Sequence, residues 1–148
     1  MKAKLILEDG KVFHGFGCGT NEKVYGEVVT NTAMVGYQEV ITDPANAGLI
    51  VCMTYPLIGN YGVNEQDSES LTPQAKGIVC REFCDHPSNW RCESSIYDYM
   101  QQNRLTGLEG VDTRALTRYL RHNGPLQGAI APAEEDDNQI LGELREMN

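Results

Sequence analysis

Short strand-like segments fill the first half of the sequence, and segments with helical spacing follow in the second half. Apolar and β-branched runs of strand length, bounded by turn residues, occur at residues 4–9, 12–16, 24–31, 48–54 and 75–83. The first two runs flank Asp9-Gly10, a dipeptide typical of tight β-hairpin turns. We therefore expect a mixed α/β fold in which most strands precede the helices.

The stretch GVDTRALTRYLRHNG, residues 110–124, has the clearest helical pattern in the chain. Asp112 is a typical N-cap residue and Gly124 a typical stop, so together they predict where this helix begins and ends. One side of the predicted helix is apolar and carries Leu116, Tyr119 and Leu120. The opposite side is basic and carries Arg114, Arg118 and Arg121.

Three further segments complete the expected secondary structure. Residues 95–103 have apolar side chains at helical spacing, and residues 126–132 form a strand-like apolar run. Residues 133–148 are expected to form a closing helix, because their clustered acidic side chains suit the positive end of a helix dipole. No repeat or linker interrupts this order, so residues 1–148 are expected to form a single domain.

Composition excludes several classes of function. The chain has 148 residues, enough for a core without disulfides or metal, and a net charge of -9 that disfavours nonspecific binding to nucleic acid or anionic membranes. Its first apolar run, residues 5–7, ends at Glu8 and is too short for a signal peptide. Five cysteines without regular spacing suit reduced thiols, so a cytoplasmic location is expected.

The stretch MTYPLIGNYGVN, residues 53–64, reads as an irregular but ordered segment. Its proline and two glycines break both helices and strands, and it offers no thiol, imidazole or amine for catalysis. Uncharged segments rich in aromatic residues are typical of interface cores, but also of loops that plug their own core. The candidate contact residues are Tyr55, Asn60, Tyr61 and Asn64.

The basic side of the helix at 110–124 has two interpretations. A row of charges is most often a solvated helix face. Guanidinium groups also make planar, bidentate contacts with carboxylate or phosphate, and the chain is otherwise acidic. Arg114, Arg118 and Arg121 are therefore candidates for docking to an acidic partner or for binding an anion.

A second cluster suggests metal or thiol chemistry. Cys80, Cys84, His86 and Cys92 lie within thirteen residues and could supply four zinc ligands. Their spacing does not match the paired C-x2-C frameworks of common zinc sites, and Cys80 ends an apolar run in which a thiol can simply be buried. A zinc-binding or thiol-dependent domain is kept as the alternative function, and no metal is expected.

Several long strings resemble the small chain of glutamine-hydrolysing carbamoyl phosphate synthetase. They are LEDGKVFHG, GEVVTNTAMVGYQEVITDP, MTYPLIGNYGVN, PSNWR and GVDTRALTRYLRHNG, and the resemblance runs from about Leu5 to Ala131. It covers only the N-terminal domain of that family. The implied fold is a swivelling β/β/α domain of three layers, with one mainly parallel sheet, one antiparallel sheet and helices.

The resemblance also implies a function. In that family a glutamine amidotransferase domain, whose nucleophile and base motifs are absent here, releases ammonia. A large chain then uses the ammonia with bicarbonate, ATP and Mg to make carbamoyl phosphate for pyrimidine and arginine biosynthesis. The implied role of this chain is to dock the amidotransferase to the large chain. We accordingly expect no catalytic residue and no cofactor in the chain itself, with the large chain and the missing amidotransferase domain as its partners.

Overall fold

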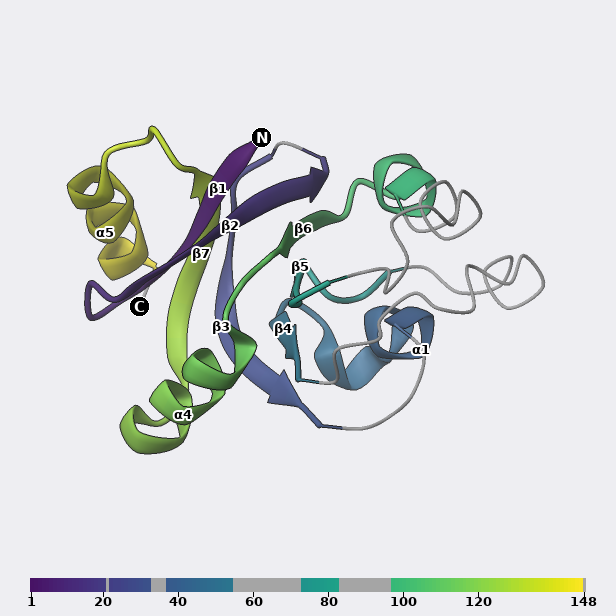
Figure 1. Ribbon diagram of the computed structural model, residues 1–148, viewed down its shortest axis with the longest axis horizontal. Coiled ribbons are helices and arrows are strands. Elements are labelled where there is room, and N and C mark those ends of the chain that lie inside the picture. Colours follow the sequence, from purple (N-terminus) through teal and green to yellow (C-terminus); the bar gives the residue numbers. More distant parts are fainter. Residues whose placement is uncertain (21, 33–36, 55–72, 83–96, 148) are drawn as a thin grey trace.

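The computed structural model describes residues 1–20, 22–32, 37–54, 73–82 and 97–147 (Figure 1). Its strands are β1 (Lys2–Leu7), β2 (Val12–Gly19), β3 (Val24–Asn31), β4 (Ile50–Met53), β5 (Gly77–Val79), β6 (Thr106–Glu109) and β7 (Leu126–Pro132). Its helices are α1 (Tyr37–Thr42), the short 3-10 helix η1 (Pro44–Asn46), α4 (Thr113–Asn123) and α5 (Asp137–Glu146), and residues 97–102 are also helical. The expected mixed α/β class is confirmed.

All seven strands belong to one sheet that closes into a barrel, in the order β1-β2-β6-β5-β4-β3-β7. Strands β3, β4, β5 and β6 pair in parallel, whereas every pairing that involves β1, β2 or β7 is antiparallel. The expectation of two separate stacked sheets is therefore wrong. Strands β3 and β6 each have one parallel and one antiparallel neighbour, so they join the two halves, and closure leaves none of the described strands at a sheet edge.

The barrel interior and α4 share one hydrophobic core. Alternate side chains of the strands point into it, as expected for the two-residue period of a β-strand. Leu116 and Leu120 of α4 belong to this core. Other residues of α4 share a pocket with Thr32, Thr54 and Arg81, so the helix lies at the end of the barrel where β3, β4 and β5 finish. The buried members from the strands are Ala3, Leu5, Leu7, Phe13, Val28, Ile50, Cys52, Val79, Leu108 and Ile130.

Helices cover two parts of the outer barrel surface. Helix α1 and residues 97–102 cover the parallel strands, where Ile41 and Met100 pack against Met53 and Ile78. Helix α5 lies beside β1 and β7, with Ile140 and other apolar side chains packed on the strands (Figure 1). Within the described residues no helix is both long and apolar enough to cross a lipid bilayer.

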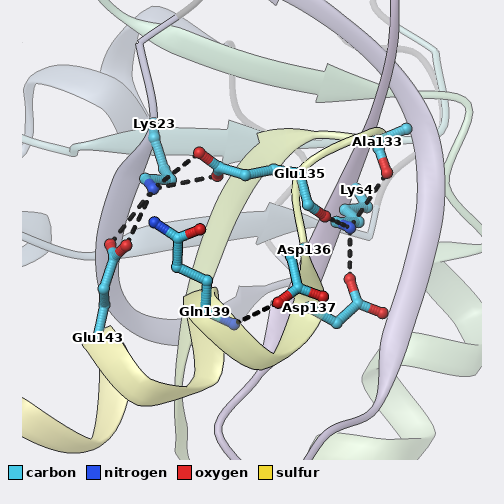
Figure 2. Close-up of polar contacts among 8 residues, drawn as sticks. All are labelled: Lys4, Lys23, Ala133, Glu135, Asp136, Asp137, Gln139 and Glu143. Atoms are coloured by element: carbon cyan, nitrogen blue, oxygen red, sulfur yellow. Dashed lines mark hydrogen bonds and ion pairs between the residues drawn. The ribbon is translucent and has the colours of Figure 1, made fainter.

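Two lysines attach α5 and the turn before it to the barrel (Figure 2). The Lys4 ammonium donates to the carbonyl oxygens of Ala133 at 3.1 Å and Glu135 at 2.5 Å, and it forms an ion pair with Asp137. Lys23 forms ion pairs with Glu135 at 3.0 Å and Glu143 at 3.3 Å. The end of the chain is thereby fixed to strands near its beginning.

The closing helix begins later than the sequence predicts, at Asp137 instead of residue 133. The residues before it form a turn, in which the amide of Ala133 donates to the carbonyl of Lys2 and the amide of Glu135 to that of Pro132. Asp136 is then the N-cap, and its carboxylate accepts a hydrogen bond from the amide of Gln139. The clustered acids thus divide between this turn, the cap and the first helical turn.

Candidate functional site

Helix α4 presents its arginines to solvent because both of its ends and its buried face are fixed. The carboxylate of Asp112 accepts from the amide of Ala115 at 3.0 Å, and Gly124 ends the helix with φ of 76°. Leu116 and Leu120 are buried in the barrel core. The cap, the stop and the buried face predicted from sequence are confirmed. The three arginines on the other side of the helix, Arg114, Arg118 and Arg121, are exposed.

These three arginines line one pocket of about 380 Å³, which we call the arginine cleft. A fourth arginine, Arg81, belongs to the same cleft although it comes from a different part of the chain. The sequence analysis did not single it out. The described residues that line it are Thr32, Thr54, Arg81, Thr113, Arg114, Thr117, Arg118 and Arg121.

The arginine cleft lies at the carboxyl ends of three parallel strands. Thr32 directly follows β3, Thr54 directly follows β4, and Arg81 comes shortly after β5. Helix α4 forms the rest of the lining. In sheets with parallel strands this end is the usual location of binding sites, because the loops that leave the strands converge there. The sequence places Arg81 inside the run expected as a strand at residues 75–83, whereas β5 ends at Val79, so nothing in the sequence indicated that Arg81 lies at the end of a strand beside its parallel neighbours.

Backbone hydrogen bonds hold the lining residues in place. The carbonyl of Arg81 accepts from the amide of Gly110 at 2.9 Å, which links the end of β5 to the segment that leads into α4. The amide of Thr54 donates to the carbonyl of Asn31 at 3.1 Å and so links the ends of β4 and β3. The cleft is therefore built on fixed backbone, although its arginine side chains extend into solvent.

The hydroxyls of Thr54 and Thr117 have no proton left to donate to a molecule bound in the cleft. The Oγ1 atom of Thr54 donates to the carbonyl of Asn31 at 3.0 Å, and that of Thr117 donates to the carbonyl of Thr113 at 2.7 Å. A hydroxyl has one proton, so these two oxygens retain only lone pairs for another group. The guanidinium groups are therefore the main hydrogen-bond donors of the cleft.

The positive charge of the cleft is not neutralised by neighbouring acids in the described part of the chain. The ion pairs found there are Lys4–Asp137, Lys23–Glu135 and Lys23–Glu143, and none involves a cleft arginine. Arg114 lies in the first turn of α4, next to the positive end of the helix dipole, and Arg118 is four residues further on. Each of these placements lowers the stability of the helix by a few tenths of a kcal/mol, or by about 1 kcal/mol at most. A bound anion would reduce both unfavourable electrostatic effects.

The described thiols are unsuited to nucleophilic catalysis. Burial raises the pKa of the Cys52 thiol to about 12, outweighing the opposing effect of a hydrogen bond with Thr117. Burial likewise raises the pKa of Cys18 and of the fully buried Cys80, and the negative charge of Glu109 adds to the effect. These thiols stay protonated at neutral pH, whereas a reactive cysteine needs a stabilised thiolate.

Only one of the four candidate zinc ligands lies among the described residues. Cys80 belongs to the hydrophobic cluster beneath α1, and Cys84, His86 and Cys92 lie outside the described residues. No group of at least three His, Cys, Asp or Glu side chains that could hold a metal occurs in the part of the chain that the structure describes. The zinc alternative remains a prediction.

The interface prediction for residues 53–64 also falls mostly on positions that the structure leaves out. Tyr55, Asn60, Tyr61 and Asn64 lie outside the described residues. Thr54, in the same stretch, lines the arginine cleft. The described part of this stretch thus reaches the cleft at Thr54, and the four candidate contact residues remain a prediction.

Comparison with known proteins identifies close relatives. A sequence model of the carbamoyl-phosphate synthase small chain, CPSase domain, matches residues 5–130. The carbamoyl phosphate synthase small chain of Clostridium perfringens is 56% identical over 99% of this chain and 41% of its own length. The pyrimidine-specific small chain of Halalkalibacterium halodurans is 50% identical over 98% of this chain and 40% of its own length. The chain thus spans about 40% of the length of these relatives.

Proposed function

The chain belongs to the family of carbamoyl phosphate synthase small chains, and we propose that it is the non-catalytic domain that docks the amidotransferase onto the large chain. In the complete enzyme, glutamine hydrolysis on the amidotransferase supplies ammonia to the large chain. The large chain combines this ammonia with bicarbonate and ATP to form carbamoyl phosphate. The domain described here would fix the relative position of the two catalytic parts.

The observation that carries this proposal is the arginine cleft. Four arginines face solvent around one pocket in a chain whose net charge is -9, and no described carboxylate pairs with them. A protein surface of this kind attracts an acidic partner and orients it during association. A scaffold that has only to fold needs no such cluster.

A purely positioning role also agrees with the chemistry of the described residues. Their thiols have raised pKa values, and the two described histidines, His14 and His122, are exposed. An amidotransferase-type cysteine needs a nearby base that stabilises its thiolate. Ammonia release from glutamine is accordingly assigned to another part of the enzyme.

Calorimetric titration of this chain into purified large chain tests the proposal. The expected result is saturable binding with one copy of the chain per large chain. The chain alone should release no glutamate from glutamine in a coupled glutamate dehydrogenase assay. Absence of binding to the large chain would overturn the docking role. Glutamate release that disappears when one cysteine is changed to serine would overturn the non-catalytic assignment.

A further inference from the structure

We propose that the arginine cleft binds an extended acidic segment of a protein partner, whose carboxylates contact Arg81 and the arginine row of α4. The partner is the large chain if the proposed function holds, so the identity of the partner rests on that proposal. The cleft and its chemical preference for such a segment follow from the described residues and do not depend on that proposal.

Positive charge is concentrated in the cleft. Four of the twelve basic residues of the chain line this single pocket, whereas no Asp or Glu is among the described residues that line it. Two described acids are close in sequence to the cleft arginines: Glu82 follows Arg81 but is not among the lining residues, and the carboxylate of Asp112 is engaged in capping α4. Arginine is also the residue best suited to bidentate contact with carboxylates. The cleft is therefore complementary to negatively charged groups.

The length of the arginine row favours an extended segment over a single small anion. Arg114 and Arg121 are seven positions apart on α4, which is roughly 10 Å at about 1.5 Å per helical residue. In an extended peptide, alternate side chains point the same way and are roughly 7 Å apart, so a segment with acids at every second position extends along such a row. An extended segment can contact the arginines along the whole row, whereas one phosphate ion can contact them only where their side chains converge.

A threonine of the cleft distinguishes further between a peptide and a phosphate. Thr54 has already given its hydroxyl proton to the carbonyl of Asn31, so its oxygen presents lone pairs to an occupant. Backbone amides of an extended peptide can donate to such an oxygen, whereas the oxygens of a fully ionised phosphate would be repelled by it. Arginines along the cleft and an acceptor oxygen in its lining match a peptide that carries both carboxylates and amides.

The first test measures binding of a fluorescein-labelled peptide of alternating Glu and Ser by fluorescence polarisation at low ionic strength. Changing Arg114, Arg118 and Arg121 together to Gln should weaken binding roughly tenfold or more, and Arg81→Gln about twofold to fivefold. Glutamine preserves helix propensity, and circular dichroism verifies the fold. Lys76→Gln is the matched control, because Lys76 is exposed and does not line the cleft. Equal affinity for all variants would overturn the proposal.

Two competing occupants give different results. Inorganic phosphate should displace the peptide only at concentrations far above that of an unlabelled copy, and displacement at equal concentration would make the cleft a small-anion site. The chain also contains its own alternating acids, Glu65, Asp67 and Glu69, outside the described residues. Neutralising them should leave the affinity for the peptide unchanged. A marked rise in affinity would show that the chain fills its own cleft, contrary to the proposal.

Titration of the same variants with purified large chain separates this inference from the proposed function. If the large chain binds and the arginine variants weaken that binding, both stand. If the large chain binds all variants equally well, docking uses another surface and the inference fails alone. If the peptide binds through the arginines but the large chain does not bind at all, the cleft is real and the proposed function fails.

Discussion

Arg81 and Arg118 line the same cleft, although Arg81 comes shortly after strand β5 and Arg118 lies in the middle of helix α4. Parallel pairing of β3, β4 and β5 places the ends of these strands together, and α4 packs beside them. The hydrogen bond from the amide of Gly110 to the carbonyl of Arg81 fixes the two segments relative to each other. The positive surface is thus a product of the tertiary fold.

Lys4 should be a major contributor to the attachment of α5. Its side chain is only 4% exposed and bonds two carbonyls and Asp137, so Lys4→Met keeps an unbranched chain but removes three polar contacts. We expect a loss of about 1.5–3 kcal/mol in the free energy of unfolding measured in urea. The matched control is Lys2→Met on the same strand, where the side chain is exposed and a change within about 0.5 kcal/mol is expected. Equal effects at both positions would contradict this role.

Closure of the barrel between β2 and β6 should depend on Gly19. Its φ is 73°, and a Cβ atom there would lie 2.2 Å from the carbonyl oxygen of Leu105. Gly19→Ala is expected to reduce the free energy of unfolding by about 2 kcal/mol or more. Gly142→Ala in α5 provides the control, because no atom lies within 4 Å of its added Cβ. Helix propensity predicts that this change stabilises the protein by about 0.5–1 kcal/mol.

Local signals in the sequence were sufficient for much of this fold. The hairpin at Asp9-Gly10, the strands at 24–31 and 126–132, and both ends of α4 agree with the structure. Each of these features depends on neighbours in sequence: turn residues, a run of apolar or β-branched residues, or a capping side chain beside a helical repeat. The exposed position of the α4 arginines follows from the same periodicity.

Other features depend on contacts between distant residues and could not be predicted in this way. Strand β6 has only four residues, one of them Gly107, and it is a strand because β2 and β5 pair with it on both sides. Helix α1 has six residues and depends on packing against β4. Barrel closure depends on which strands pair with each other, and no local sequence pattern specifies those partners. The same pairing brings Arg81 into the cleft.

The buried thiols provide a test of the non-catalytic assignment. Because the pKa of Cys52 is raised to about 12, only about one thiol in ten thousand is ionised at pH 8, against roughly a quarter for an exposed cysteine. Alkylation of Cys52 by iodoacetamide, followed by peptide mass mapping, should therefore be at least about 100-fold slower in the native protein than in denaturant. The rate should rise with pH, since only the thiolate reacts and its fraction rises with pH. Native and denatured rates that agree would show that Cys52 is accessible and reactive.

Association with the large chain tests most directly whether this domain docks through its arginine cleft. Arg118→Glu reverses one charge at the cleft, and the new carboxylate lies near Arg114 and Arg121 on α4, so the helix should be preserved. Stopped-flow measurements at low ionic strength should show association slower by roughly threefold to tenfold, with Lys76→Glu close to wild type. The difference should disappear at about 1 M salt, where the screening length is about 3 Å. Equal association rates for Arg118→Glu and wild type at every ionic strength would contradict docking through the cleft.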